Sequence, residues 1–417
     1  MKGYRVVAIA FTLGLSSLAY LVFVKGMPLL IIGQRMFAGV DEFVLLAVPF
    51  FVLSGQLMNR TGITEDLIRF CDLLVGRIAG ALAHITIVAS IFFAGITGAA
   101  VADVAALGSV LIPAMKKQGY SAEYSAAVTV TSSIIGPIIP PSIIMVIYGS
   151  VVGESIAALF LGGFAPGLLI GLALMLVAYY YAKKEHHPRR LEPIPRQQGL
   201  RIARRATLGL LVPLILIGGI LSGMFTATEA AAVAAAYALL IDILVFRRLT
   251  WHDIRASLLE AALVSSVLLM IIASAKLLGI MLTIERVPDA VATAILSLTD
   301  NRYLVLLLIN VFLLFMGMIM ETGAIVIILA PILLPVAVKV GIDPLHFALV
   351  MLVNVNIGLA TPPLGVCLFA AAPIAQCPYE RIALVALPFI FAEIAVLFLI
   401  SYVPTVVLFL PILAGFH

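Results

Sequence analysis

The chain has 417 residues, of which 63% are hydrophobic and only 11% are charged, with a formal net charge of +4. Soluble domains carry about 25% charged residues, so this composition excludes a soluble globular protein and indicates an integral membrane protein. The three cysteines, Cys71, Cys367 and Cys377, match no metal-binding spacing and are expected to be packing residues.

Long apolar stretches recur along the whole chain, for example at 6–24, 160–181, 208–221 and 382–410. A membrane-spanning helix needs about 20 apolar residues, and by this criterion we expect about eight to ten full spans plus shorter re-entrant pieces. No small-residue cleavage site follows the first stretch, so we expect it to remain as a span.

Lys and Arg residues cluster at alternate connections between the apolar stretches. One threading places 19 of the 25 basic residues in the cytoplasm, and eight of them lie in the linker 183–205. The positive-inside rule therefore assigns these connections to the cytoplasmic side. The linker could also bind lipid headgroups or nucleic acid, but a topology anchor is the simpler interpretation, and we expect no nucleic-acid partner.

Two segments, 81–115 and 303–338, have the length of a helical hairpin that enters the membrane and returns to the same side. The expected turns lie at 95–98 and 317–323. The first segment begins and ends on the cytoplasmic side, whereas the second begins and ends outside. This opposite orientation is typical of the inverted repeats of alternating-access carriers.

Two stretches rich in Gly and Pro, 132–142 and 354–364, repeat each other at an offset of 222 residues. The same offset pairs Gly95 with Gly317. Either stretch alone would be interpreted as a kink, because Gly and Pro are common in membrane spans. Two such stretches in register, each paired with a hairpin, indicate the broken helices that form the binding site of a secondary transporter.

A broken helix exposes carbonyl groups that suit Na⁺ at one half-helix end and N–H groups that suit a carboxylate at the other. Side chains add oxygen atoms at the same points, namely Ser132, Ser133, Asn354, Asn356 and Thr361 in the breaks and Thr97 and Thr322 at the hairpin turns. Oxygen ligands without thiolates or imidazoles fit an alkali cation rather than a transition metal.

Two carboxylates lie within apolar sequence, Asp103 on the returning arm of the first hairpin and Glu321 at the turn of the second. Ionisable groups at membrane depth are candidates for function, so these could attract coupling cations or hold the hairpin tips. The alternative is a structural hydrogen bond to a neighbouring helix terminus. Lys276 must likewise snorkel or find a partner, and Glu229 is expected to belong to a helix start with Thr226.

No catalytic constellation and no Walker A sequence is visible, so we expect neither an enzyme nor direct use of ATP. Energy would come from an ion gradient or from a partner protein. A channel is a rival hypothesis, but channels need a continuous pore lined by polar rings. A stand-alone Na⁺/dicarboxylate symporter without a binding protein is a second rival.

The stretches 51–60 and 98–115, together with both break motifs, closely resemble the large membrane subunit (DctM-type) of tripartite ATP-independent periplasmic (TRAP) transporters. The resemblance implies an all-α integral membrane protein, an inverted-repeat elevator-type transporter with two re-entrant helical hairpins and two broken helices. It implies Na⁺-coupled import of an organic acid, a C4-dicarboxylate or similar carboxylate, through the bacterial inner membrane. The implied partners are a small four-helix membrane subunit (DctQ-type), as a separate chain, and a periplasmic solute-binding protein (DctP-type).

Carried over position by position, the resemblance implies at least two Na⁺ sites and a solute site between them. The first Na⁺ site would comprise Gly95, Gly98, Ser132, Ser133 and Gly136, and the second Gly317, Thr322, Asn354, Asn356, Gly358 and Thr361. The solute would lie near Thr97, Pro141, Ser142, Thr361 and Pro363. The second motif ends in Leu364 where the first has Ser142, so the two halves need not contact the solute equally.

The expected organisation alternates scaffold and transport segments. Scaffold helices occupy 1–80 and 261–302, transport halves occupy 81–152 and 303–376, connecting and scaffold helices with the basic linker occupy 153–260, and a C-terminal helix occupies 377–417.

Overall fold

The computed structural model describes residues 2–190, 192 and 194–416, which form helices and no strand. The first helices are α1 (Lys2–Ala19), α2 (Leu29–Val40), α3 (Ala47–Arg60), α4 (Ile63–Val75), α5 (Ala81–Thr97), α6 (Ala100–Lys117), α7 (Ala122–Ser133), α8 (Ile143–Val152) and α9 (Ile156–Lys184). They are followed by α10 (Arg196–Leu221), α11 (Ala227–Ile241), α12 (Trp251–Ile284), α13 (Val287–Leu298), α14 (Arg302–Ile319), α15 (Thr322–Lys339), α16 (Pro344–Gly358), α17 (Val366–Ala375), α18 (Tyr379–Tyr402) and α19 (Thr405–Leu413). Short helical segments are η1 (Tyr20–Val24), η2 (Phe43–Leu46) and η3 (Asp242–Phe246).

Eight helices in the described part of the chain are long and apolar enough to cross a membrane. The all-α integral membrane fold expected from the sequence is therefore confirmed, with both hairpins (α5–α6 and α14–α15) and both broken helices (α7–α8 and α16–α17) in place. The turn of the second hairpin, at Met320–Glu321, falls within the expected range, and that of the first, at Gly98–Ala99, starts at the last expected residue and extends one residue further.

The repeat of 222 residues extends over almost the whole chain, on either side of α10. With this offset α1, η1 and α4 match α11, η3 and α13, and the helices from α5 to α9 match those from α14 to α18. The single long helix α12 matches α2, η2 and α3 together. The sequence motifs thus mark only the best-preserved part of a repeat that includes every spanning helix except α10.

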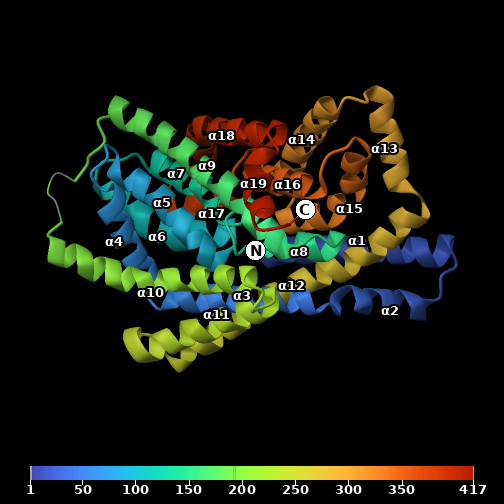
Figure 1. Ribbon diagram of the computed structural model, residues 1–417, viewed down its shortest axis with the longest axis horizontal. Helices are drawn as coiled ribbons and strands as arrows, with labels where there is room; N and C mark the ends of the chain where they lie inside the picture. Colours follow the sequence, from blue (N-terminus) through green and yellow to red (C-terminus); the bar gives the residue numbers. More distant parts are fainter. Residues whose placement is uncertain (1, 191, 193, 417) are drawn as a thin grey trace.

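The helices lie in two layers (Figure 1). Helices α2, α3, α10, α11 and α12 run along the long axis at the lower side of the view, and the hairpins and broken helices lie above them. Within the lower layer, α3 packs on α11 and α12, while α1 and α2 pack on α12. The two layers meet where α3 and α10 contact α5, and where α12 contacts α15.

The two repeats interlock within the upper layer. The outer arm α6 of the first hairpin packs on half-helix α17 of the second repeat, and the equivalent arm α15 packs on half-helix α8 of the first. Lys116 at the end of α6 donates a hydrogen bond of 2.9 Å to the carbonyl of Ala375 at the end of α17. One arm of each hairpin therefore packs on a half-helix of the other repeat.

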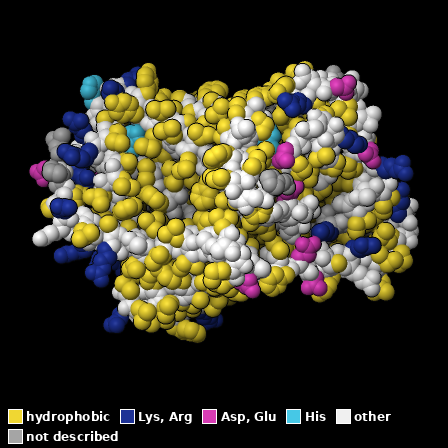
Figure 2. Space-filling model, in the orientation of Figure 1, with side chains coloured by type: hydrophobic (Ala, Val, Ile, Leu, Met, Phe, Trp, Pro, Cys, Tyr) yellow, Lys and Arg dark blue, Asp and Glu magenta, His cyan; other side chains and the backbone are white. Residues whose placement is uncertain are grey.

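Basic side chains gather at one end of the molecule, as the sequence predicts for the cytoplasmic side. Figure 2 shows Lys and Arg side chains over the end that holds α4 and the start of α10, with acidic and basic side chains mixed at the opposite end. By the positive-inside rule the first end is cytoplasmic, and the end holding α13 is the outer one.

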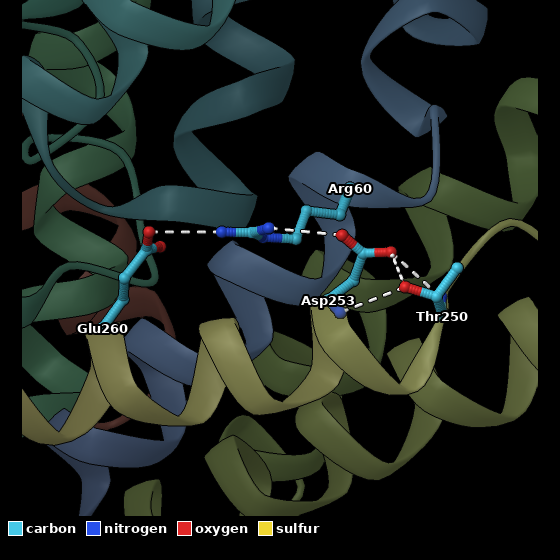
Figure 3. A network of polar contacts seen from close by, with 4 residues as sticks. All are labelled: Arg60, Thr250, Asp253 and Glu260. Carbon is cyan, nitrogen blue, oxygen red and sulfur yellow. Dashed lines mark hydrogen bonds and ion pairs between the residues drawn. The ribbon is translucent and has the colours of Figure 1, made fainter.

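A polar network joins two helices of the lower layer near the cytoplasmic end (Figure 3). The Arg60 guanidinium at the end of α3 lies 3.4 Å from Asp253 Oδ1 and 3.2 Å from Glu260 Oε1, both on α12. Asp253 also accepts hydrogen bonds from the backbone N–H and the hydroxyl of Thr250, which caps the start of α12. Because one guanidinium binds two turns of the same helix, α3 and α12 are held in a fixed register.

Two expectations about element bounds need correction. The basic linker expected over 183–205 is shorter, because α9 continues to Lys184 and α10 begins at Arg196. The segment 377–417, expected as one C-terminal helix, contains both α18 and α19, since Pro404 disfavours helical geometry at Val403.

The tip of the second hairpin touches the break in α16–α17 with backbone against backbone. An ideal Cβ placed on Gly358 would lie 2.4 Å from the carbonyl carbon of Gly317, and one on Gly317 would lie 3.1 Å from Gly358 Cα. No side chain can yield at this contact, so a residue larger than glycine would have to separate the two chain segments.

The orientation can be tested by labelling from each side. In a Cys377→Ser background, we expect Arg189→Cys to react only with reagent on the cytoplasmic side, and Asp300→Cys only with reagent on the outer side, because both positions are exposed at opposite ends. Cys71 and Cys367 are buried and provide the unreactive background. Labelling of both new cysteines from the same side would contradict the assigned topology.

The glycine contact can be tested by a matched pair of substitutions. Gly358→Ala should lower the unfolding temperature of the purified protein, since forced overlap in a packed interior costs about 1–3 kcal/mol. Gly218→Ala on α10 is the control, because its added methyl group would meet no atom within 4 Å and alanine favours a helix over glycine by about 1 kcal/mol. Equal unfolding temperatures for the two variants would show that the tip does not need this close approach.

Candidate functional site

The first break lies between α7, which ends at Ser133, and α8, which begins at Ile143. The intervening residues are buried within protein, as non-helical backbone at membrane depth requires. Ser142 starts α8: its hydroxyl donates to the Pro137 carbonyl at 2.6 Å and accepts from the Met145 N–H at 3.3 Å. The Pro140–Pro141 bond is cis, as is the equivalent Pro362–Pro363 bond.

The tip of the first hairpin covers this break. Gly98 has a φ of +60°, which L side chains rarely adopt, and a Cβ placed there would lie 2.8 Å from the Pro141 carbonyl oxygen. Gly95 packs differently, because a Cβ on this residue would lie 2.6 Å from the Pro213 ring of α10 and 3.8 Å from the Pro140 carbonyl oxygen. The structure thus brings Gly98 directly to the break, and places Gly95 between the break and the lower layer.

Asp103 lies fully buried in the first turn of α6, beside the break. A Cβ on Gly136 would lie 2.2 Å from Asp103 Oδ2, so the carboxylate rests directly on this glycine. A carboxylate in the first turn of a helix is stabilised by the helix dipole. The same position brings a negative charge close to the Gly136 segment that the sequence assigned to a Na⁺ site.

Ser132 and Ser133 form the last turn of α7. Ser133 donates its hydroxyl hydrogen to the Val130 carbonyl at 2.7 Å, and Ser132 donates to Thr129 at 3.3 Å while accepting from Ser90 of α5 at 3.0 Å. A hydroxyl has one hydrogen and two lone pairs. With their hydrogens directed at the preceding turn, both serine oxygens keep lone pairs that could face a cation.

The second break lies between α16, which ends at Gly358, and α17, which begins at Val366. Asn354 and Asn356 lie in the last turns of α16 and are fully buried. The Asn354 amide donates to the backbone and side-chain oxygens of Asn310 at 3.0 and 2.8 Å, and the Asn356 amide donates to the Leu352 carbonyl at 2.8 Å. These bonds use the amide hydrogens and leave the side-chain oxygens directed elsewhere.

Three buried oxygens around this break receive no hydrogen bond from any described residue: Asn354 Oδ1, Asn356 Oδ1 and Thr322 Oγ1. Thr322 opens α15 beside the tip that touches Gly358. Buried polar atoms are almost always paired, so these unpaired oxygens are candidate ligands for an ion or a water molecule. Thr361, also assigned to this site, is buried and donates its hydroxyl to Ile357 at 2.8 Å.

Glu321 caps α15, because its carboxylate accepts a hydrogen bond of 3.3 Å from the Ala324 N–H. The structural alternative considered for this residue, a hydrogen bond to a helix terminus, is therefore present, and the terminus belongs to its own hairpin. The carboxylate fixes the tip, and its charge lies one residue from Thr322.

The residues expected near the solute differ in their surroundings. Pro141 and Ser142 are buried, whereas Pro363 is exposed and its carbonyl accepts a short hydrogen bond from the Tyr379 hydroxyl. Tyr379 stacks on Phe369 of α17 with ring centroids 4.4 Å apart. The side chain of Thr97 lies outside the described part of the chain. The two breaks thus differ in exposure at the positions that the resemblance assigns to the solute.

The structure adds residues that the sequence analysis did not single out. Asn310 of α14 joins Asn354 to Ser401 of α18, donating to the Ser401 hydroxyl at 2.9 Å. Ser90 of α5 supports Ser132 in the first repeat. Asn310 could have been noticed as an amide inside a leucine-rich span, but nothing in the sequence indicates which broken helix it contacts.

Comparison with known proteins identifies the family. The profile of the family described as "Tripartite ATP-independent periplasmic transporter, DctM component" matches residues 4–406. The chain is 41% identical over 403 residues to the isethionate TRAP transporter permease protein DctMQ of Oleidesulfovibrio alaskensis, a match that covers 97% of this chain but 64% of that protein. It is 40% identical over 403 residues to the sialic acid TRAP transporter large permease protein SiaM of Vibrio cholerae, covering 97% of this chain and 94% of that protein.

Two further likenesses agree with these. The C4-dicarboxylate TRAP transporter large permease protein DctM of Pseudomonas aeruginosa is 39% identical over 377 residues, covering 90% of this chain and 88% of that protein. The crystal structure of the YdaH transporter of Alcanivorax borkumensis has a TM-score of 0.63, covering 96% of this chain and 97% of that chain, and at 14% identity it shows the fold alone. With its hairpins, broken helices and family match, the chain belongs to the DctM component of the tripartite ATP-independent periplasmic (TRAP) transporters, a family of multi-pass membrane permeases and not of enzymes.

Proposed function

We propose that this chain is the large permease subunit of a Na⁺-coupled secondary transporter that imports an organic acid across the bacterial inner membrane. The acid would be delivered by a periplasmic solute-binding protein (DctP-type), and a small membrane subunit (DctQ-type) would complete the complex. The isethionate relative supports a second membrane subunit, since it carries the name DctMQ and extends well beyond the part matched by this chain.

The observation that carries the proposal is the set of unpaired buried oxygens at the second break. The oxygens of Asn354, Asn356 and Thr322 lack a hydrogen-bond donor among the described residues, and Asn354 and Asn356 lie in the last turns of the half-helix α16, beside the break. Neutral oxygens of this kind suit a hard monovalent cation such as Na⁺. The Glu321 carboxylate beside Thr322 adds negative charge without occupying the ligand oxygens.

A second Na⁺ would bind at the first break. The hydroxyl oxygens of Ser132 and Ser133 have lone pairs to offer, and the Asp103 carboxylate lies against Gly136 in the same region. One elementary charge that moves through 100 mV contributes about 2.3 kcal/mol. Two ions with an inward gradient could therefore drive uptake of an anionic solute against its own gradient.

The solute would be an organic anion bound near the half-helix starts. The N-termini of α8 and α17 direct N–H groups toward the breaks, and such termini attract negative charge. The names of the relatives refer to isethionate, sialic acid and C4-dicarboxylates, all of which are organic acids. A C4-dicarboxylate or similar carboxylate is our proposal for this chain.

An elevator movement fits the way the helices pack. Hairpins and broken helices of both repeats interlock through the α6–α17 and α15–α8 contacts, so they would move as one body. The lower layer, tied together by contacts such as Arg60 with Asp253, would remain as the scaffold. Alternating access would then expose the breaks first to the outer side and afterwards to the cytoplasm.

Alanine substitutions at the two breaks test the Na⁺ sites. With the partner proteins in proteoliposomes, Ser133→Ala or Asn356→Ala should raise the Na⁺ concentration for half-maximal uptake about ten-fold, since loss of one buried polar partner costs about 1–3 kcal/mol. Uptake would be measured with labelled succinate, sialic acid and isethionate, with and without a Na⁺ gradient.

The matched control is Ser16→Ala, which removes an exposed hydroxyl that bonds only to the preceding turn of α1. It should leave the Na⁺ dependence unchanged, and all three variants should insert and purify like the original protein. Unaltered Na⁺ dependence in both Ser133→Ala and Asn356→Ala would rule out the assigned sites.

A further inference from the structure

Two cavities lie between the layers, one near each end of the molecule, and the internal repeat relates them. The outer cavity has a volume of about 420 Å³ and is bounded by α2, α12 and α15. The inner cavity has a volume of about 380 Å³ and is bounded by α3, α4 and α6. Equivalent residues line them: Gln56 and Leu278, Ala105 and Ile327, and Ser109 and Pro331 are each 222 residues apart.

The two cavities differ in charge despite this equivalence. Arg35 and Lys276 line the outer cavity, and no acidic side chain is among its described lining residues. The only charged residue described in the lining of the inner cavity is Glu65, which lies 3.8 Å from Arg248. Repeat-related spaces on opposite sides of the membrane therefore have different electrostatics.

Lys276 is held in place by its neighbours. Its stem crosses Gly39 of α2, where a Cβ would lie 2.4 Å from Lys276 Cγ, and its Nζ lies 3.6 Å from Glu42 Oε1. Glu42 is shared, because Ser150 of α8 donates to its other oxygen at 3.1 Å. Arg35 forms no ion pair with any acidic residue in the described ranges. Two positively charged side chains therefore line the outer cavity, and Glu42 is the acidic partner of one of them.

The depth of Lys276 fits a cavity that is open to water. Lys276 lies eight residues before the outer end of α12 at Ile284, which corresponds to about 12 Å along a helix. A charged side chain at such depth is found in protein or beside a water-filled cavity, because contact with lipid is costly. A cavity of this volume is also within the range of about 300–1,000 Å³ that small-molecule sites occupy.

We propose that the outer cavity is a receiving site for the organic anion, in which Lys276 and Arg35 of the scaffold attract the carboxylate before it reaches the breaks. This inference rests on the proposed function and adds residues of the lower layer to it. A fixed excess of positive charge in a confined space raises the local concentration of an anion and speeds its capture. The inner cavity has no such excess, so the anion would leave it without being held.

The electrostatics can be measured without transport, by placing one cysteine in each cavity. Leu278→Cys and its repeat equivalent Gln56→Cys would be made in a Cys377→Ser background, since both positions are half-buried lining residues. The rates of reaction with a sulfonate-bearing and a trimethylammonium-bearing methanethiosulfonate would be expressed as a ratio, relative to that of a free thiol in solution.

At Leu278→Cys the anionic reagent should be favoured, and Lys276→Gln should reduce the ratio about sixteen-fold, because one unit charge at about 5 Å changes each rate about four-fold in opposite directions. High salt should remove this difference. The ratio at Gln56→Cys should be lower and insensitive to Lys276→Gln. Lys339→Gln is the control, since Lys339 is exposed on the same side and paired with Asp289 at 2.8 Å.

Two results would overturn the proposal. The first is a ratio at Leu278→Cys that Lys276→Gln and Arg35→Gln leave unchanged. The second is an anion preference that disappears when phosphatidylglycerol is added to vesicles of phosphatidylcholine, which would mean that a lipid headgroup occupies the cavity. Because labelling needs no uptake, these results would leave the proposed function standing.

Uptake provides the second readout. For whichever of succinate, sialic acid or isethionate is transported, Lys276→Gln should raise the half-saturating concentration about four-fold, with a maximal rate within about two-fold of the original, whereas Lys339→Gln should change neither. A loss of maximal rate at unchanged half-saturation would indicate that Lys276 only holds Glu42 and α8 in position, and would contradict a receiving site. Absence of uptake for every acid, with the expected labelling ratios, would instead count against the proposed function.

Discussion

The constraint on which the whole structure depends is that backbone polar groups cannot remain unpaired in the bilayer, where each one costs several kcal/mol. Both breaks place such groups at membrane depth. Short-range bonds pair some of them, such as Ile139 N–H with Ile135 at 2.9 Å and Thr361 N–H with Gly358 at 3.1 Å. The remainder must be enclosed by protein, which the hairpin tips accomplish at Gly98 and Gly317. The hairpins, the interlocked repeats and the covering helices can all be understood as the enclosure that two interrupted helices require.

Much of this enclosure could be predicted from the sequence, because the repeat and its Gly and Pro residues are local signals. Hairpin turns, breaks and the helix start at Glu229 with its partner Thr226 follow from short patterns. Long-range contacts left no such signal. Nothing in the sequence pairs Asn310 with both Asn354 and Ser401, and nothing indicated that Lys276 would meet Glu42. The extent of the repeat was also underestimated, because α12 is continuous where its counterpart is divided into α2, η2 and α3, and a repeat that preserves shape without motifs is hard to recognise.

The two breaks provide oxygen atoms from different chemical groups. At the first, the oxygens belong to hydroxyl groups whose hydrogens are bound to the preceding turn, and the buried carboxylate of Asp103 lies alongside. At the second, buried amide oxygens are left unpaired because their own N–H groups are bound elsewhere, and the carboxylate of Glu321 holds the tip. A carboxylate at a ligand position attracts a cation strongly, whereas amide oxygens hold it by dipoles alone. Each break nevertheless has a carboxylate nearby, Asp103 at the first and Glu321 at the second, so the two sites differ in the type of their neutral oxygens.

The outer and inner cavities also differ, in their charge, and this difference would affect the rate of transport. Arg35 and Lys276 belong to α2 and α12, so in an elevator movement they would stay in the scaffold while the solute moves past them. Charges that do not accompany the solute cannot change how far it accumulates, which depends only on the ion gradients and the number of ions moved. They can change how often the empty site meets an anion, and that rate is limiting whenever the solute is scarce. The two cavities occupy equivalent positions in the two repeats but differ in charge. This difference would favour capture of the anion on the outer side without altering the extent to which it accumulates.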